Sequence, residues 1–123
     1  MADYIPIYSG ALRLTLIAGA AITGGQLVYI SASGQVSPTT AATDAWVGVA
    51  AFDQPIVGQP VTVLAGGGVQ LLAASGTITA GAAVCAATGG AVAAFGSGTD
   101  YNQVVGIAVT APASGQLQVL MRR

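Results

Sequence analysis

The chain has 123 residues and a formal net charge of -1, and only 6% of its residues are charged, against about 25% in an ordinary soluble domain. It contains no histidine, lysine or glutamate, so it lacks the imidazole of Ser-His-Asp and Cys-His enzymes, a Schiff-base lysine and histidine ligands for a metal. Its three arginines are too few to neutralise the phosphates of a nucleic acid, because that affinity depends on the number of cationic contacts. We therefore expect a structural or binding protein that is not an enzyme, with no cofactor, metal, nucleic-acid partner or small-molecule substrate.

Residues 1–9 are predicted to form an extended N-terminal arm ahead of a single β domain over 10–123. Pro6 disfavours a helix and biases the residue before it toward extended backbone. The apolar and aromatic arm suits strand addition to the sheet edge of a partner or a neighbouring subunit, or it closes its own barrel as an edge strand. The residues that we expect to make the contact in the first case are Tyr4, Ile5, Pro6, Ile7 and Tyr8. The segment also lacks the basic and apolar regions of a signal peptide, so we expect synthesis in the cytoplasm.

Five short strands are predicted in the first half of the chain. Leu12, Leu14 and Leu16 alternate with Arg13 and Thr15, a period of two that turns one side of a strand toward a core. The strands that follow are expected at 27–30, around Val36, at 46–52 and at 61–64, with turns rich in Gly, Ser and Pro between them.

The second half repeats this succession of strands, at 68–74, 82–87, 90–95, 104–109 and 116–121. The alanine run from Ala82 to Ala94 is the one place where a helix could intrude, but Gly89 and Gly90 in its middle favour a hairpin. Glycine costs about 1 kcal/mol in a helix interior, and few stretches of this chain are free of Gly or Pro. About ten strands with Gly-rich turns predict an all-β protein, a small β-barrel or a sandwich.

The two halves are also similar in sequence. Ile22 to Gly25 matches Ile78 to Gly81, and the motif from Val47 to Ala50 matches the one from Val105 to Ala108. At the start of each half, Gly10 to Leu14 aligns with Gly67 to Leu71, which places Leu14 opposite Leu71. This ordered series predicts a tandem duplication, with one repeat over 10–65 and the other over 67–121.

The long stretch from Gln54 to Thr99 contains no charged residue, but we do not expect it to cross a membrane. A spanning helix needs about 20 predominantly apolar residues in a row. Pro55, Pro60 and frequent glycines interrupt this stretch, so no membrane partner is predicted.

A chain with so many small residues has a sparse core. A buried alanine contributes less than the roughly 1.5–3 kcal/mol of a large apolar side chain. Low charge also removes the repulsion that keeps proteins monomeric. We therefore predict a homo-oligomer, whose interface supplies burial that the single chain lacks.

Few residues are candidates for chemistry. Asp44 and Asp100 occupy matching places in the two halves, as in an aspartic-protease dyad, but neither is followed by the Thr/Ser-Gly of such enzymes, so we interpret them as turn residues. Trp46 and Phe52 are expected in the core, with an exposed sugar-binding patch as the alternative. The lone Cys85 is expected to be a small buried apolar residue rather than a nucleophile.

Several short motifs resemble those of phage head proteins of the capsid cement, or head decoration, type. They are the Ile-Thr-x-Gly-x-x-Val turns at Ile22 to Val28 and Ile78 to Val84, the Val-Gly-Val/Ile-Ala strands at Val47 to Ala50 and Val105 to Ala108, and the closing strand from Leu117 to Met121.

The resemblance implies an all-β, barrel-like subunit that forms homotrimers on the outer surface of an icosahedral head. Its implied partner is the major capsid protein, whose neighbouring subunits it would hold together against internal DNA pressure. The rival hypothesis is a fibre or adhesion module on a host-facing surface, with carbohydrate as one ligand.

Overall fold

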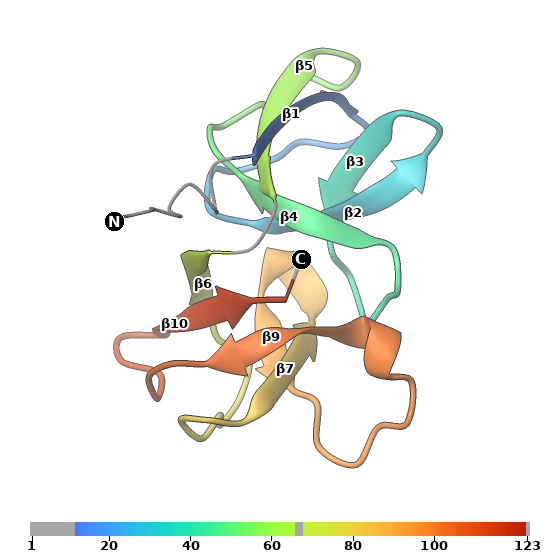
Figure 1. Ribbon diagram of the computed structural model, residues 1–123. Helices are drawn as coiled ribbons and strands as arrows, with labels where there is room; N and C mark the ends of the chain where they lie inside the picture. The colour runs from blue at the N-terminus through green and yellow to red at the C-terminus, as the bar shows by residue number, and fades with distance from the viewer. Residues whose placement is uncertain (1–11, 66–67, 123) are drawn as a thin grey trace, which may run out of the picture.

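Ten strands make up nearly all the regular structure in residues 12–65 and 68–122, which are those that the computed structural model describes. The first five form a closed barrel in the order β1-β3-β2-β4-β5 (Figure 1). Their bounds are β1 Leu12–Ala18, β2 Leu27–Ala32, β3 Gln35–Pro38, β4 Trp46–Ala50 and β5 Pro60–Ala65. The predicted all-β class is confirmed.

The remaining strands form a second sheet below the barrel in Figure 1, in the order β6-β10-β9-β7-β8. Their bounds are β6 Val69–Ala73, β7 Ala83–Ala86, β8 Val92–Ala94, β9 Val104–Ala108 and β10 Gln116–Met121, with the 3-10 helices η2 Thr88–Gly90 and η3 Tyr101–Gln103 between them. The alanine run forms the hairpin β7–β8, as predicted. Among the described residues, no helix has the length and apolar composition needed to cross a membrane.

The two sheets have the same strand connectivity. In the barrel, β1 pairs in parallel with β3 through Ala18 and Val36, and in the second sheet Ala74 forms a parallel bridge to Val92. Each sheet also has a register shift at its central pair, β2 with β4 and β7 with β9. The strand pairings therefore define equivalent positions in the two sheets, while their origin by duplication stays a prediction.

These pairings correct the sequence alignment at the start of the second half. Leu14 pairs with the buried Val63, and the residue that pairs with the equivalent buried Val119 is Gln70. Leu71 instead lies on the outer face and is 55% exposed. The alignment was wrong by one residue, and in a strand one residue changes the face.

Alternation in β1 is confirmed, because Leu14 and Leu16 pack against the barrel core while Arg13 and Thr15 are exposed. That core is made of small and medium side chains: Ala18, Ile22, Val28, Val36, Ala50, Val61 and Val63.

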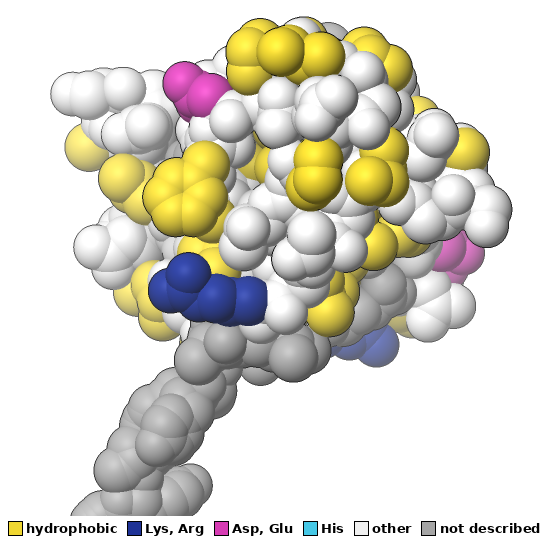
Figure 2. All heavy atoms as spheres, turned by 90° about the horizontal axis from the view of Figure 1, so that it is seen from above, with side chains coloured by type: hydrophobic (Ala, Val, Ile, Leu, Met, Phe, Trp, Pro, Cys, Tyr) yellow, Lys and Arg dark blue, Asp and Glu magenta, His cyan; other side chains and the backbone are white. Residues whose placement is uncertain are grey.

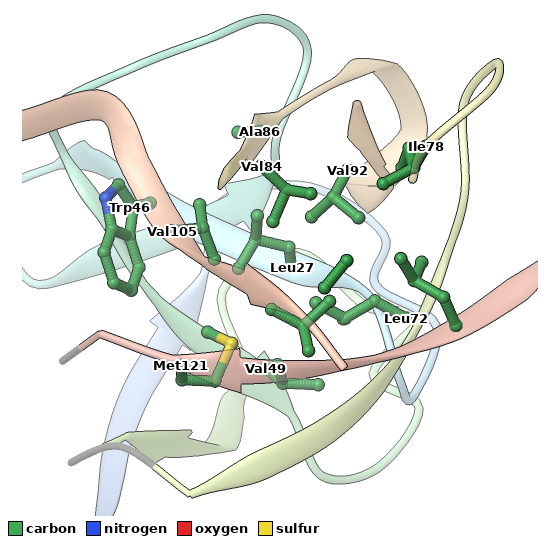
Figure 3. Close-up of a cluster of buried hydrophobic side chains, with 13 residues drawn as sticks. Leu27, Trp46, Val49, Leu72, Ile78, Val84, Ala86, Val92, Val105 and Met121 are labelled. Carbon is green, nitrogen blue, oxygen red and sulfur yellow. The ribbon is translucent and has the colours of Figure 1, made fainter. Parts of the chain in front are cut away.

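A second cluster joins the two sheets. Leu27, Trp46 and Val49 belong to barrel strands, yet they pack with the buried side chains of the second sheet. Figure 3 shows Leu27 among these side chains, with Val84 and Leu72 around it. The two sheets therefore share one apolar core.

Trp46 and Phe52 have opposite environments, so the prediction that both are core residues is right for Trp46 and wrong for Phe52. Trp46 is 1% exposed, and its indole N–H donates to the backbone carbonyl of Asn102 at 3.2 Å. Phe52 is 63% exposed, because β4 ends at Ala50 and the chain bends there. The register shift in β4 also breaks the period of two on which the prediction relied.

Candidate protein-interaction surface

The outer face of the second sheet carries a row of apolar side chains. The strand registers align Val69 of β6, Leu120 of β10, Ile107 of β9 and Ala83 of β7 in one line across the sheet. Val69, Leu120 and Ile107 are 55%, 50% and 49% exposed. Large apolar side chains at adjacent positions of a solvent-facing sheet are typical of a surface that binds protein.

The local sequence explains why this face is apolar. In β10 the buried residues Leu117, Val119 and Met121 alternate with exposed ones, as predicted for the closing strand. Gln116 and Gln118 fill the first exposed positions, but Leu120 occupies the next. In β6 the exposed positions hold Val69 and Leu71 where β1 has Arg13 and Thr15.

A shallow hollow of about 430 Å³ lies on this face. It is lined by Ala83, Val104, Gly106, Ile107, Leu120 and Met121. Tyr101 and Arg122 complete the lining, and the guanidinium of Arg122 donates to the backbone carbonyl of Tyr101. The hollow is apolar with one cation in its lining, which suits an apolar protein segment.

Gly106 is required at the floor of this hollow. A Cβ there would lie 2.1 Å from the carbonyl oxygen of Leu120, so the neighbouring strand leaves no room for a side chain. Gly48 has the same relation to Leu64, also at 2.1 Å. The glycine of each Val-Gly-Val/Ile-Ala motif thus permits close approach of two strands.

A further group of exposed apolar side chains lies in the loop between β4 and β5. Phe52, Ile56 and Val57 are 63%, 59% and 61% exposed. Figure 2 views the molecule from above, the side of the barrel, and shows apolar side chains in several places with few charged groups between them. Every charged residue that the structure describes is exposed, and none lies in either core cluster.

Asp100, one of the two aspartates considered for chemistry, makes a turn interaction. The carboxylate of Asp100 accepts from the backbone N–H of Asn102 at 3.2 Å at the start of η3, and in the first half the Thr43 hydroxyl accepts from the N–H of Ala45 at 3.1 Å. These are the turn interactions that the sequence predicts. Within residues 12–65 and 68–122, no group of three or more metal-binding side chains comes together.

Cys85 is half-buried on β7, with its thiol 4.0 Å from the carbonyl oxygen of Ala94. The predicted contact residues of the arm, Tyr4, Ile5, Pro6, Ile7 and Tyr8, lie outside the described residues. The surface on the second sheet was not predicted, because the sequence alignment of Leu71 with Leu14 assigned Leu71 to the core side of its strand.

Burial raises the pKa of the Cys85 thiol above its ordinary value of 9.0, and this outweighs a backbone hydrogen bond that lowers it. Folding therefore favours the neutral thiol, so its stabilising contribution is present below pH 9.0 and is lost as the pH rises through the folded-state pKa. We expect the free energy of unfolding to decrease more steeply above pH 9.0 in wild type than in Cys85→Ala. Urea titrations of both proteins at several pH values on either side of pH 9.0 measure this difference. If the free energy of unfolding changes with pH in the same way in both proteins, the prediction is contradicted.

Comparison with known proteins identifies the chain as a phage structural protein. It belongs to the phage cement protein family, whose model matches residues 9–123. This confirms the family resemblance found in the sequence. A search of the curated proteins found no match.

Among solved structures, the chain is similar to the N base of the head fiber gp8.5 of bacteriophage phi29. The two are 18% identical with a TM-score of 0.68, and the match covers 89% of this chain and 92% of that chain. At this identity the similarity shows a shared fold.

Proposed function

We propose that the chain is a capsid decoration (cement) protein, which binds the outer surface of a phage head as a homotrimer and stabilises contacts between major capsid subunits. The observation that carries this proposal is membership of the cement family over residues 9–123. The apolar outer face of the second sheet supports it, because a protein that works by packing against neighbours needs such surfaces.

The proposed mechanism depends on several weak contacts acting together. A trimer sits across the junction of several capsid subunits, and each of its arms adds a strand to a capsid sheet or fills a groove there. Tyr4, Ile5, Ile7 and Tyr8 are the proposed anchors, with Pro6 keeping the arm extended. Three linked contacts can exceed the affinity of one by a factor of about 100 or more, because the second and third contacts form within one complex.

Deletion of residues 2–9 is the test of the arm. Capsids mixed with the truncated chain should stay undecorated, because the multivalent contacts are lost. Electron microscopy and co-sedimentation with capsids measure the occupancy. A matched control replaces Ile5 and Ile7 with serine, which keeps the arm's length and removes its apolar side chains, and we expect intermediate occupancy. Normal occupancy by the truncated chain would contradict the arm's role.

A fibre or adhesion module is the second candidate, and the similarity to a head fiber base favours it. The carbohydrate-binding form of this hypothesis required an exposed Trp46. That requirement is not met, because the Trp46 side chain is buried. Electron microscopy of native particles separates the two candidates, since a cement protein forms low knobs and a fibre base carries a projecting fibre.

A further inference from the structure

Strand β6 lies at an edge of the second sheet, and β10 is the strand that pairs along its length. Just outside the two ends of β6, the Gly68 carbonyl accepts from the N–H of Met121 and the Ala74 N–H donates to the carbonyl of Gly115, both at 2.8 Å. Bonding groups alternate along an antiparallel strand, so every second residue between Gly68 and Ala74 also bonds with β10. The residues in between turn their N–H and C=O groups to the opposite side of β6.

Val69 and Leu71 are the residues whose backbone groups face this open side. Among residues 12–65 and 68–122, no strand pairs with them there, since β8 meets the chain only after β6, at the bridge between Ala74 and Val92. The side chains of Val69 and Leu71 lie on the outer face of the sheet and are both 55% exposed. The open edge is therefore short, apolar and uncharged, and its free backbone groups suit an extended segment.

The N-terminal arm is attached within reach of this edge. Leu12, where β1 begins, pairs with Ala65 at the end of β5, and Val69 follows Ala65 by four residues. A separation of about 5.5 Å between paired Cα atoms and about 3.5 Å per residue put Val69 at most about 20 Å from Leu12. Five extended residues from Leu12 back to Ile7 and one strand spacing cover about 22 Å. The last residues of the arm lie nearest the first residues of β6, which makes an antiparallel pairing the natural one.

The arm sequence fits the open edge. Pro6 has no N–H, so in an added strand it must occupy a position that faces away from β6. Ile5 and Ile7 then turn their backbone groups toward β6, one opposite Leu71 and the other opposite Val69. Directly opposite residues of an antiparallel pair lie on the same face, so the two isoleucines would lie beside the exposed side chains of β6.

We propose that the arm pairs antiparallel with β6 of its own chain, with Ile5 opposite Leu71 and Ile7 opposite Val69. Backbone hydrogen bonds and the burial of these four side chains stabilise the pairing. Attachment favours the chain's own edge over that of another copy, because a short linker gives an effective concentration of about millimolar. The inference goes beyond the proposed function, since it concerns the free protein: the arm covers an open edge there, and it leaves that edge when it binds a capsid.

Amide hydrogen exchange, followed residue by residue by NMR, tests the pairing. The N–H groups of Val69 and Leu71 should exchange about tenfold more slowly, or slower still, in the full chain than in a chain lacking residues 2–9. The N–H groups of Gln70 and Leu72 face β10, so they should be protected in both chains and show that the truncated chain is folded. Equal exchange of Leu71 in the two chains would overturn the proposal.

Two proline substitutions test which side of the arm faces β6. Ile5→Pro removes an N–H that the proposal directs at β6 and puts a proline ring against that strand, so we expect Leu71 to lose its protection. Tyr4→Pro is the matched control, because it introduces the same residue one position away, where the N–H faces away from β6, and protection should remain. Loss of protection in both variants, or in neither, would overturn the predicted orientation.

A mixture distinguishes the chain's own arm from the arm of another copy. Isotope-labelled chains that lack residues 2–9 are unfolded and refolded together with unlabelled full chains, so that any oligomer contains both. The Val69 and Leu71 N–H groups of the labelled chains should stay unprotected, since each full chain uses its arm on its own β6. Protection of the labelled chains would overturn the proposal, because it would show that arms pair with β6 of other copies.

Capsid decoration is an independent readout, and it separates this inference from the proposed function. If the full chain protects Val69 and Leu71 but never decorates capsids, the proposed function is wrong and the inference stands. If the full chain decorates capsids while the free protein shows no protection at these residues, the inference is wrong and the proposed function stands.

Discussion

Replacing Trp46 with alanine is expected to lower the free energy of unfolding by about 3–5 kcal/mol. The side chain is 1% exposed and belongs to the cluster that joins the two sheets, so its removal leaves a cavity at their junction. It also leaves the carbonyl of Asn102 without the indole N–H at 3.2 Å. The loss is therefore one of packing and of a hydrogen bond between the halves.

Urea unfolding followed by far-UV circular dichroism, at one fixed protein concentration, measures this effect. Trp46 is the sole tryptophan of the chain, so fluorescence would not report on the variant. Phe52→Ala is the control, because this aromatic ring is 63% exposed, and we expect a change of no more than about 0.5 kcal/mol. Trp46→Phe keeps an aromatic ring without the N–H and should fall between the two. Equal losses in Trp46→Ala and Phe52→Ala would contradict a junction role for Trp46.

The strands themselves could be predicted from sequence because their signals are local. Alternation in β1 and β10 and the glycine turns between strands depend on residues close together in the chain. The turns at Ile22 to Gly25 and Ile78 to Gly81 illustrate this, since Gly25 and Gly81 have φ values of 92° and 89°. Residues other than glycine rarely adopt this backbone conformation, so a glycine at these positions indicates a turn from the sequence alone.

The arrangement of the strands could not be predicted in the same way. The parallel pairing of β1 with β3 joins residues that are not neighbours along the chain, and no local pattern specifies it. The register shift in β4 places Trp46 and Val49, which are three residues apart, in the shared core, while Val47 and Ala50 pack in the barrel core. An alternation rule applied to this strand therefore assigns side chains to the wrong faces.

The candidate surface was hidden by the same difficulty. Leu71 looks like a core residue when it is aligned with Leu14, and only the pairing of Gln70 with Val119 shows that it faces outward. An apolar residue in a strand indicates burial only when the register is known. The exposed row of Ala83, Ile107 and Leu120 therefore required the structure.

Replacing Gly106 with alanine is expected to lower the free energy of unfolding by about 3 kcal/mol, comparable to the larger effects of overpacking. The added Cβ would lie 2.1 Å from the carbonyl oxygen and 2.9 Å from the carbonyl carbon of Leu120. Both are backbone atoms, so the clash cannot be relieved by a rotamer change, and β9 must move away from β10. Urea unfolding measures the loss.

Gly34→Asn is the matched control for this substitution. Gly34 has a φ of 72° with nothing within 4 Å of its added Cβ, and asparagine adopts this conformation more readily than other side chains. We expect a change of no more than about 1 kcal/mol. Gly48→Ala should resemble Gly106→Ala, since its Cβ would lie 2.1 Å from the carbonyl oxygen of Leu64. A Gly106→Ala protein as stable as the control would contradict this prediction, because it would mean that β9 and β10 can accommodate a side chain at this position.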